Sequence, residues 1–294
     1  MVALGNFDGV HLGHQAVLRR AVEVGRERGA RVVAATFDPH PRAVLGGGGS
    51  PGLLTTLALR REALLAYGAD EVAVITFDLD LSKKSPREFV MDVLVGDMRA
   101  EAIVVGENFR FGHKAAGDVG DLAALMEEMG GKAYAVPVRA AGESGEISSS
   151  RVRTLLSEGA VAQAAGLLGR PYVLRGEVVE GDRRGRTIGF PTANVRPDPA
   201  ALVPARGVYA GFVRFGEKTY AACTNVGVAP TFDRTDSRVE AHLLDFRGDL
   251  YGCVVDVGFT QRILDERRFS GVQELIEQIH RDVEEARRIT RNPA

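Results

Sequence analysis

The apolar positions of the chain change their spacing near residue 169. Before that point, runs of consecutive apolar residues alternate with stretches in which apolar residues recur every three or four positions. After it, short segments of alternating apolar and polar residues follow one another, separated by glycine-containing turns. Continuous apolar runs are typical of parallel strands covered on both faces, whereas alternation is typical of antiparallel strands with one face in solvent. We therefore predict an α/β domain with a parallel sheet over residues 1–168 and an antiparallel barrel or sandwich over residues 169–294.

The first half contains five candidate strands separated by candidate helices, which is the pattern of parallel βαβ units. The strands are expected at residues 2–4, 31–37, 71–77, 102–106 and 132–138. Helices are expected after the first strand, over 57–67, near 86–94 and over 122–129. In the second half, apolar residues at helical spacing from Val272 to Val283 predict a terminal helix that packs on the strands. Ser270 and Gln273 have the spacing of a capping box at its start.

A glycine-containing turn joins the first strand to the first helix. It reads Gly5-Asn-Phe7-Asp-Gly-Val-His11-Leu-Gly13-His14. Free backbone N–H groups and the helix dipole make such a turn an anion site, and Gly13 allows a phosphate to approach the backbone closely. His11 and His14, three positions apart, can face one point and stabilise charge on a phosphate leaving group. The alternatives are a metal-binding histidine pair and two surface histidines.

Three further segments follow strands or begin helices in the first half. Phe37–Pro41 carries His40, and Gly106–Gly112 carries Asn108. Ligands bind at the carboxyl ends of the strands in open α/β sheets, so both side chains are candidates, although both segments are also consistent with surface turns. The third segment precedes a helix and offers hydroxyl groups, N–H groups and arginines for a second phosphate clamp, or only a helix cap: Ser148, Ser149, Ser150, Arg151 and Arg153.

The second half carries a candidate kinase site. The run from Gly181 to Asn194 includes Arg186, Gly189 and Pro191, and its glycines and arginines suit a nucleotide polyphosphate or form only a basic hairpin loop. Thr192 and Asn194 project to the same side of an extended segment and offer hard oxygen ligands for Mg²⁺. Glu240 and His242 lie on one side of an alternating strand, where Glu240 is a candidate general base or a solvated glutamate.

Composition and charge exclude several classes of protein. The 294 residues carry a net charge of −2, with 18 basic and 21 acidic residues before residue 169 and 19 and 18 after it, so neither half suggests a nucleic-acid partner. The two cysteines, Cys223 and Cys253, have no metal or redox spacing and indicate buried free thiols. No signal peptide or transmembrane run is present, and we expect a cytoplasmic protein without a membrane partner. The chain begins almost on its first strand, which suggests a missing N-terminal lead.

Taken in order, these motifs resemble the prokaryotic bifunctional riboflavin kinase/FMN adenylyltransferase (FAD synthetase) family from end to end. The carrying segments are Gly5–His14, Phe37–Pro41, Gly106–Gly112, Ile147–Arg153, Gly189–Asn194, Asn225–Thr231 and Val239–Phe246. Seven motifs in the right order are far more specific than any one of them. This chain has Asn108 where many family members have Asp.

The resemblance implies a Rossmann-like nucleotidyltransferase domain that joins FMN to AMP, followed by a six-stranded riboflavin kinase barrel that phosphorylates riboflavin from ATP. In the first domain it implies that His11, His14 and the segment Ser148–Arg153 bind the ATP phosphates, beside Gly5, Phe7, Gly13, His40 and Asn108. In the barrel it implies Mg²⁺ on Thr192 and Asn194, Glu240 as base, and ATP on Gly181, Arg186, Gly189 and Pro191. ATP is the co-substrate, and the flavins are substrates and products.

Two other functions are consistent with parts of the pattern. One is an adenylyltransferase for another phosphorylated small molecule, with a regulatory flavin-binding barrel. The other is a non-catalytic flavin-binding module. The set Thr192, Asn194 and Glu240 argues against the first, and the two phosphate clamps argue against the second. The sequence leaves open the oligomeric state, the nucleotide preference, the flavin redox requirement and channelling of FMN between sites.

Overall fold

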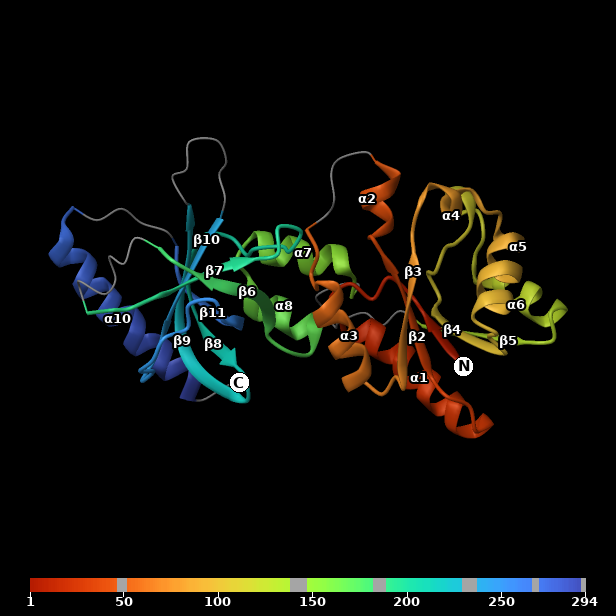
Figure 1. Cartoon of the computed structure of the whole chain (residues 1–294), viewed down its shortest axis with the longest axis horizontal. Coiled ribbons are helices and arrows are strands. Elements are labelled where there is room, and N and C mark those ends of the chain that lie inside the picture. The colour runs from red at the N-terminus through yellow and green to blue at the C-terminus, as the bar shows by residue number, and fades with distance from the viewer. Residues whose placement is uncertain (47–51, 138–146, 182–188, 229–236, 266–269, 292–294) are drawn as a thin grey trace. The chain divides into compact units, whose positions relative to one another are not determined.

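The structure is a computed structural model that describes residues 1–46, 52–137, 147–181, 189–228, 237–265 and 270–291. The chain divides into two compact units, residues 1–149 and 150–294 (Figure 1). The predicted domain boundary after residue 168 stays a prediction. Within the described residues, no helix combines the length and the apolar character needed to cross a membrane.

The first unit is a five-stranded parallel sheet with the order β3-β2-β1-β4-β5. Its strands are β1 (Val2–Leu4), β2 (Val33–Asp38), β3 (Glu71–Thr76), β4 (Ala102–Gly106) and β5 (Lys132–Val136). Its helices are α1 (Leu12–Arg28), α2 (Pro41–Leu45), α3 (Leu57–Ala66), α4 (Leu79–Lys83), α5 (Pro86–Glu88), the π-helix η1 (Phe89–Asp97), the 3₁₀ turn η2 (His113–Ala115) and α6 (Val119–Glu128). The α/β fold with a parallel sheet is confirmed, and the helix expected near residues 86–94 is α5 continued by the π-helix.

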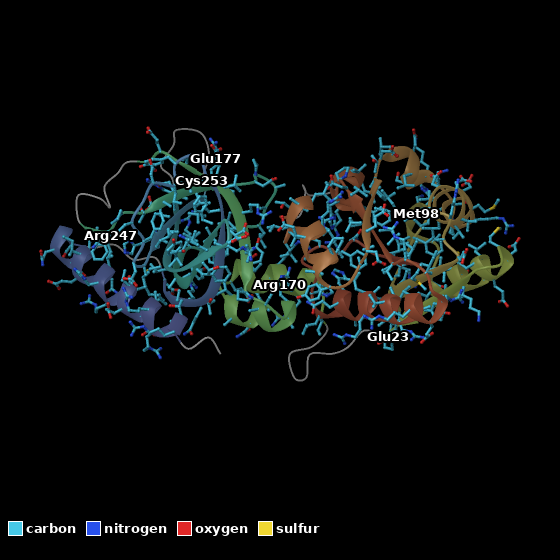
Figure 2. All side chains as sticks on the ribbon, turned by 60° about the horizontal axis from the view of Figure 1, so that its bottom comes forward. Glu23, Met98, Arg170, Glu177, Arg247 and Cys253 are labelled. Carbon is cyan, nitrogen blue, oxygen red and sulfur yellow. The ribbon has the colours of Figure 1, made fainter. Side chains whose placement is uncertain are left out.

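Two apolar layers cover the two faces of this sheet. Leu18 and Ala21 of α1 and Leu64 of α3 pack on the face that carries Ala34 and Val104. On the other face, Phe89 and Leu94 of η1 and Leu122 and Met126 of α6 pack against the strands, in one cluster with Ile103 of β4. Figure 2 shows Glu23 of α1 and Met98 at the end of η1 on opposite sides of the sheet. Alternate residues of each strand therefore enter separate cores, which explains why the strands are continuous apolar runs.

The second unit begins at residue 150, within α7 (Ser149–Ser157), includes α8 (Val161–Leu168) and continues as a closed antiparallel barrel. The strand order around the barrel is β10-β7-β6-β11-β8-β9. Its strands are β6 (Tyr172–Val179), β7 (Ala193–Pro197), β8 (Gly207–Phe215), β9 (Lys218–Val228), β10 (Ser237–Leu243) and β11 (Val254–Leu264). The helix α10 (Val272–Arg291) lies along the barrel (Figure 1). A barrel, and not a sandwich, is therefore the observed form.

The terminal helix packs on the strands as expected. Val283, Ala286 and Ile289 of α10 share a buried cluster with Cys223 of β9 and Phe190. Burial raises the pKa of the Cys223 thiol to about 12, so this thiol stays protonated at neutral pH. At the start of the helix, the Ser270 N–H and hydroxyl group both donate to the Glu274 carboxylate, at 2.9 and 2.7 Å. The acceptor is thus Glu274, one position beyond the Gln273 that the capping-box pattern suggests.

Candidate active sites

The turn between β1 and α1 has a backbone that L-residues rarely adopt. Phe7 and Val10 have φ angles of 48° and 42°, and Gly9 has a φ of 86°. For a β-branched residue such as Val10 this conformation is an outlier that costs on the order of 1–3 kcal/mol unless the surroundings impose it. Both side chains are buried in the core, Phe7 to 1% exposure and Val10 to 0%, so packing holds the turn on this path.

A buried polar network lies beneath the turn. The Asp8 carboxylate accepts hydrogen bonds from the N–H groups of Leu54 and Thr55, at 3.2 and 3.0 Å, and the Gly9 N–H donates to the Thr55 hydroxyl at 3.0 Å. The guanidinium of Arg60, fully buried, lies 3.9 Å from Asp8 and donates to the Phe37 carbonyl at 3.0 Å. The network ties the turn to the end of β2 and the start of α3, and the sequence candidates include neither Thr55 nor Arg60.

The two histidines meet at the start of α1. His11 caps the helix, because its Nδ1 accepts from the His14 N–H at 3.3 Å. The two rings stack with centroids 3.6 Å apart, and Phe7 meets His14 edge-on at 5.3 Å. Burial, and then the neighbouring His11 and Arg60, hold the pKa of His14 well below its usual value of 6.5. His14 is therefore a neutral imidazole near pH 7, able to donate a hydrogen bond but not to act as a cation.

The serine segment lies beside this turn. The Ser149 hydroxyl donates to the Asp8 carbonyl oxygen at 2.9 Å. A Cβ atom at Gly13 would stand 3.8 Å from the Ile147 carbonyl oxygen and 3.1 Å from the His11 ring. A side chain at Gly13 would therefore crowd the His11 ring, whereas its distance from the Ile147 carbonyl oxygen would be an ordinary van der Waals contact. The structure brings the first two members of the predicted clamp, Ser148 and Ser149, to the histidine turn.

The other candidates of the first half lie at strand ends. His40 follows β2 and is buried; it caps the short helix α2, with its Nδ1 accepting from the Arg42 N–H at 3.2 Å. Asn108 follows β4 and is exposed, with its Oδ1 packed 3.2 Å from where a Cβ of Gly106 would stand. Gly5 follows β1, and its N–H donates to the Ala35 carbonyl at 3.1 Å. Ser150, Arg151 and Arg153 lie on α7, within the second compact unit.

Strand pairing assembles the candidate site of the barrel. In the antiparallel register of β10 and β7, Glu240 lies directly opposite Asn194. The Val239, Ala241 and Leu243 side chains point into the core, as the alternation predicts, so Glu240 and His242 are on the other face. The guanidinium of Arg238 contacts both functional candidates, with Nε 2.7 Å from Glu240 Oε1 and Nη2 3.0 Å from Asn194 Oδ1. The sequence candidates do not include Arg238.

Of the glycine and proline candidates, Gly181 packs against Asn194, and Pro191 directly precedes Thr192. A Cβ atom at Gly181 would stand 2.3 Å from Asn194 Nδ2, so only glycine fits against this amide. Gly189 has a φ of 89°, and the Pro191 carbonyl oxygen lies 2.8 Å from Nδ1 of His242. Thr192 is half-buried, two positions before the buried Asn194. Arg186 lies outside the described residues.

Comparison with known proteins covers both halves. The family model of FAD synthetase matches residues 1–151, and that of riboflavin kinase matches residues 168–290. A bifunctional riboflavin kinase/FMN adenylyltransferase of Bacillus subtilis is 37% identical over 99% of this chain and 93% of its own length. The Escherichia coli protein of that name is 39% identical over 96% of this chain and 90% of its own.

A solved structure is similar over the whole chain. A Streptococcus pneumoniae protein described as a macrolide-efflux protein has a TM-score of 0.90 at 34% identity, covering 100% of this chain and 94% of that one. With both family models matched in order and relatives similar along nearly their full length, the chain belongs to the bifunctional riboflavin kinase/FMN adenylyltransferase family.

Proposed function

We propose that this chain phosphorylates riboflavin with ATP to give FMN and then transfers AMP from a second ATP to FMN, giving FAD and pyrophosphate. We assign adenylyl transfer to residues 1–168 and phosphorylation to residues 169–294. The observation that carries the proposal is the register pair of Glu240 and Asn194, with Thr192 two positions before Asn194. A barrel that only bound a regulatory flavin would need neither a base nor a metal ligand at this place.

In the kinase reaction, Glu240 accepts the proton of the riboflavin 5′-hydroxyl. The hydroxyl oxygen forms a bond to the γ-phosphorus of ATP as the bond from that phosphorus to the β-bridging oxygen breaks, and ADP leaves. Thr192 and Asn194 fit Mg²⁺, because both present hard oxygens from one side of an extended segment. Bound there, Mg²⁺ would neutralise charge on the phosphates. Gly181, Arg186, Gly189 and Pro191 would hold the nucleotide.

In the adenylyl transfer, a phosphate oxygen of FMN attacks the α-phosphorus of ATP, and pyrophosphate leaves. His14 suits the role of a neutral donor to the phosphates, because burial lowers its pKa and its ring stacks on His11 at the start of α1. His11, Gly13 and the N–H groups at the start of α1 would share this role with Ser148, Ser149, Ser150, Arg151 and Arg153. Gly5 and Phe7 would shape the turn, and His40 and Asn108 would line the same cleft.

The test separates the two sites by their products. Riboflavin, ATP and Mg²⁺ are incubated with the wild-type protein, with Glu240→Gln and with the double variant His11→Ala/His14→Ala, and the flavins are separated by chromatography. The wild type should give FMN and FAD. Glu240→Gln should make neither FMN nor FAD from riboflavin, but should make FAD when FMN is supplied. The double variant should make FMN and no FAD.

His113→Ala provides the matched control, since His113 is an exposed histidine of the first unit that contacts the Ser82 carbonyl oxygen at 3.0 Å. It should make both products. A wild-type protein that yields neither flavin product would contradict the proposal. FAD made from supplied FMN without any kinase activity would favour an adenylyltransferase with a regulatory barrel.

A further inference from the structure

One cation of the barrel contacts both groups on which the kinase reaction depends. Nε of Arg238 lies 2.7 Å from Glu240 Oε1 and donates to Asn194 Oδ1 at 3.1 Å, and Nη2 donates to the same Oδ1 at 3.0 Å. Arg238 and Glu240 are two positions apart on β10, and Asn194 is the partner of Glu240 on β7. The three side chains therefore share one face of two paired strands.

This arrangement differs from an ordinary surface ion pair. The side chains of Arg238 and Glu240 are 27% and 23% exposed, whereas those of Arg196 and Glu177, another arginine–glutamate pair of the barrel, are 66% and 46% exposed. Exposed ion pairs contribute little to folding stability, because water screens the charges and the side chains lose entropy when they are held together. A partly buried guanidinium with donors in a fixed fork imposes geometry on its acceptors.

The consequence for Asn194 is a defined amide orientation. An asparagine amide can turn by 180° and exchange its oxygen for its NH₂ group, and only the oxygen can ligate a cation. Because Arg238 has donors and no acceptor, it fixes the Oδ1 atom on its own side. An amide oxygen and a carboxylate each have further lone pairs, so this contact leaves acceptor capacity on both groups.

We propose that Arg238 is a positioning residue for the kinase reaction, which orients the Asn194 oxygen and the Glu240 carboxylate toward one another. The inference rests on the proposed kinase function. It predicts that loss of the fork misaligns the base and the metal ligand together, while the flavin-binding surface keeps its shape.

The experiment compares Arg238→Met, which keeps an unbranched stem without donors, with Arg238→Lys, which keeps the charge without the fork. For Arg238→Met, kcat for riboflavin phosphorylation should fall roughly 10- to 100-fold, the size of effect that small misplacements have in catalysis, with KM for riboflavin nearly unchanged. Arg238→Lys should retain an intermediate kcat. FMN adenylation should be unaffected in both.

A second readout does not depend on turnover. Mn²⁺ is titrated into the protein with ADP, and free Mn²⁺ is followed by electron paramagnetic resonance. Arg238→Met should bind Mn²⁺ more weakly than the wild type. Arg196→Met is the matched control, because it removes an arginine–glutamate contact of 2.6 Å from β7 without touching Asn194 or Glu240 in the described residues; it should match the wild type.

Three results would overturn the proposal. An unchanged kcat in Arg238→Met would show that the fork positions nothing. Tighter Mn²⁺ binding in Arg238→Met would make Arg238 a competitor of the cation. Equal losses in Arg196→Met would point to general weakening of the barrel, which thermal unfolding of all three variants also detects. A wild-type protein without kinase activity would instead refute the proposed function itself.

Discussion

The two candidate sites are held in place by different means. In the first unit, the histidines and serines meet on a turn whose backbone is strained at Phe7 and Val10, and a buried network with Asp8 and Arg60 supports it from below. In the barrel, Glu240 and Asn194 are placed by the antiparallel register of β10 and β7. Regular pairing fixes a strand site through many repeated hydrogen bonds, whereas a turn requires dedicated side chains.

This difference predicts where each site is vulnerable. The turn should fail when a single buried polar group is removed, because its partners remain buried without compensation. The strand site should keep its backbone pairing when a neighbouring charge such as Arg238 is removed, so that such a change lowers the kinase rate more than the stability of the barrel. It should also respond to steric pressure on its few irregular contacts, such as that of Gly181 with Asn194. Four perturbations, in order of decreasing expected effect, test the contrast.

Arg60→Met should have the largest effect. It leaves the buried Asp8 carboxylate without its cation and should lower the free energy of unfolding of the first unit by about 3–5 kcal/mol. FMN adenylation should be lost while riboflavin phosphorylation survives. Urea unfolding and the two activities measure this, and the neighbouring exposed Arg61→Met should stay within about 0.5 kcal/mol of the wild type. Comparable losses in both variants would show that the buried network does not matter.

Gly181→Ala tests the strand site by steric pressure. The new methyl group would stand 2.3 Å from Asn194 Nδ2, and overpacking of this kind costs about 1–3 kcal/mol. The kinase rate should fall with little change in FMN adenylation. Gly166→Ala, where a Cβ atom meets nothing within 4 Å, serves as control and should not reduce either rate. A kinase rate unaffected by Gly181→Ala would mean that Asn194 has freedom to move.

Ser149→Ala removes one support of the turn. Loss of the hydrogen bond to the Asp8 carbonyl oxygen should lower the free energy of unfolding by about 1 kcal/mol and raise KM for ATP in FMN adenylation. On the same helix, the exposed Ser157 donates to the Arg153 carbonyl at 2.8 Å. Ser157→Ala should leave KM and kcat for FMN adenylation near the wild-type values. Steady-state kinetics of the two variants distinguishes a specific effect of Ser149 from a general effect of changing α7.

A change of pH is the mildest perturbation. The pKa of His14 is lower in the folded protein than its ordinary value of 6.5, so the unfolded chain binds the proton first as the pH falls. The contribution of His14 to stability is complete above pH 6.5 and decreases below it, down to the folded pKa. Urea unfolding of the wild type and His14→Gln between pH 8 and 5 should show a shallower slope for the variant. Identical slopes would contradict the burial of a neutral His14.

Much of the fold follows from the order of apolar residues. Four of the five strands of the first unit lie within the predicted runs, and β2 extends one residue beyond its run, to Asp38. Val239, Ala241 and Leu243 point inward as their alternation indicates. The closure of six strands into a barrel depends on the pairing of β10 with β7, which no local pattern encodes. Periodicity indicates which face of a strand is buried, but it does not specify which strands pair with it.

The sequence carries weaker signals for the supporting residues than for the motifs they support. Arg60 shares a helical face with Leu64, so a charged residue on an apolar stripe was a usable signal for a buried partner. Nothing in the sequence paired it with Asp8, which is distant in the chain. Arg238 resembles any exposed strand arginine until the register of β7 and β10 brings Asn194 opposite Glu240.

The central position of β1 has a consequence for synthesis of the protein. Ala3 pairs with Ala34 on one side and with Val104 on the other, about 100 residues later in the chain. At ribosomal rates of about 5–20 residues per second, β4 is synthesised on the order of 5–20 s after β1, and until then the edge of β1 that pairs with β4 has no partner strand. During that interval β1, α1 and β2 can already assemble as one right-handed unit. The histidine turn is therefore among the first tertiary features that a nascent chain can form, well before the barrel exists.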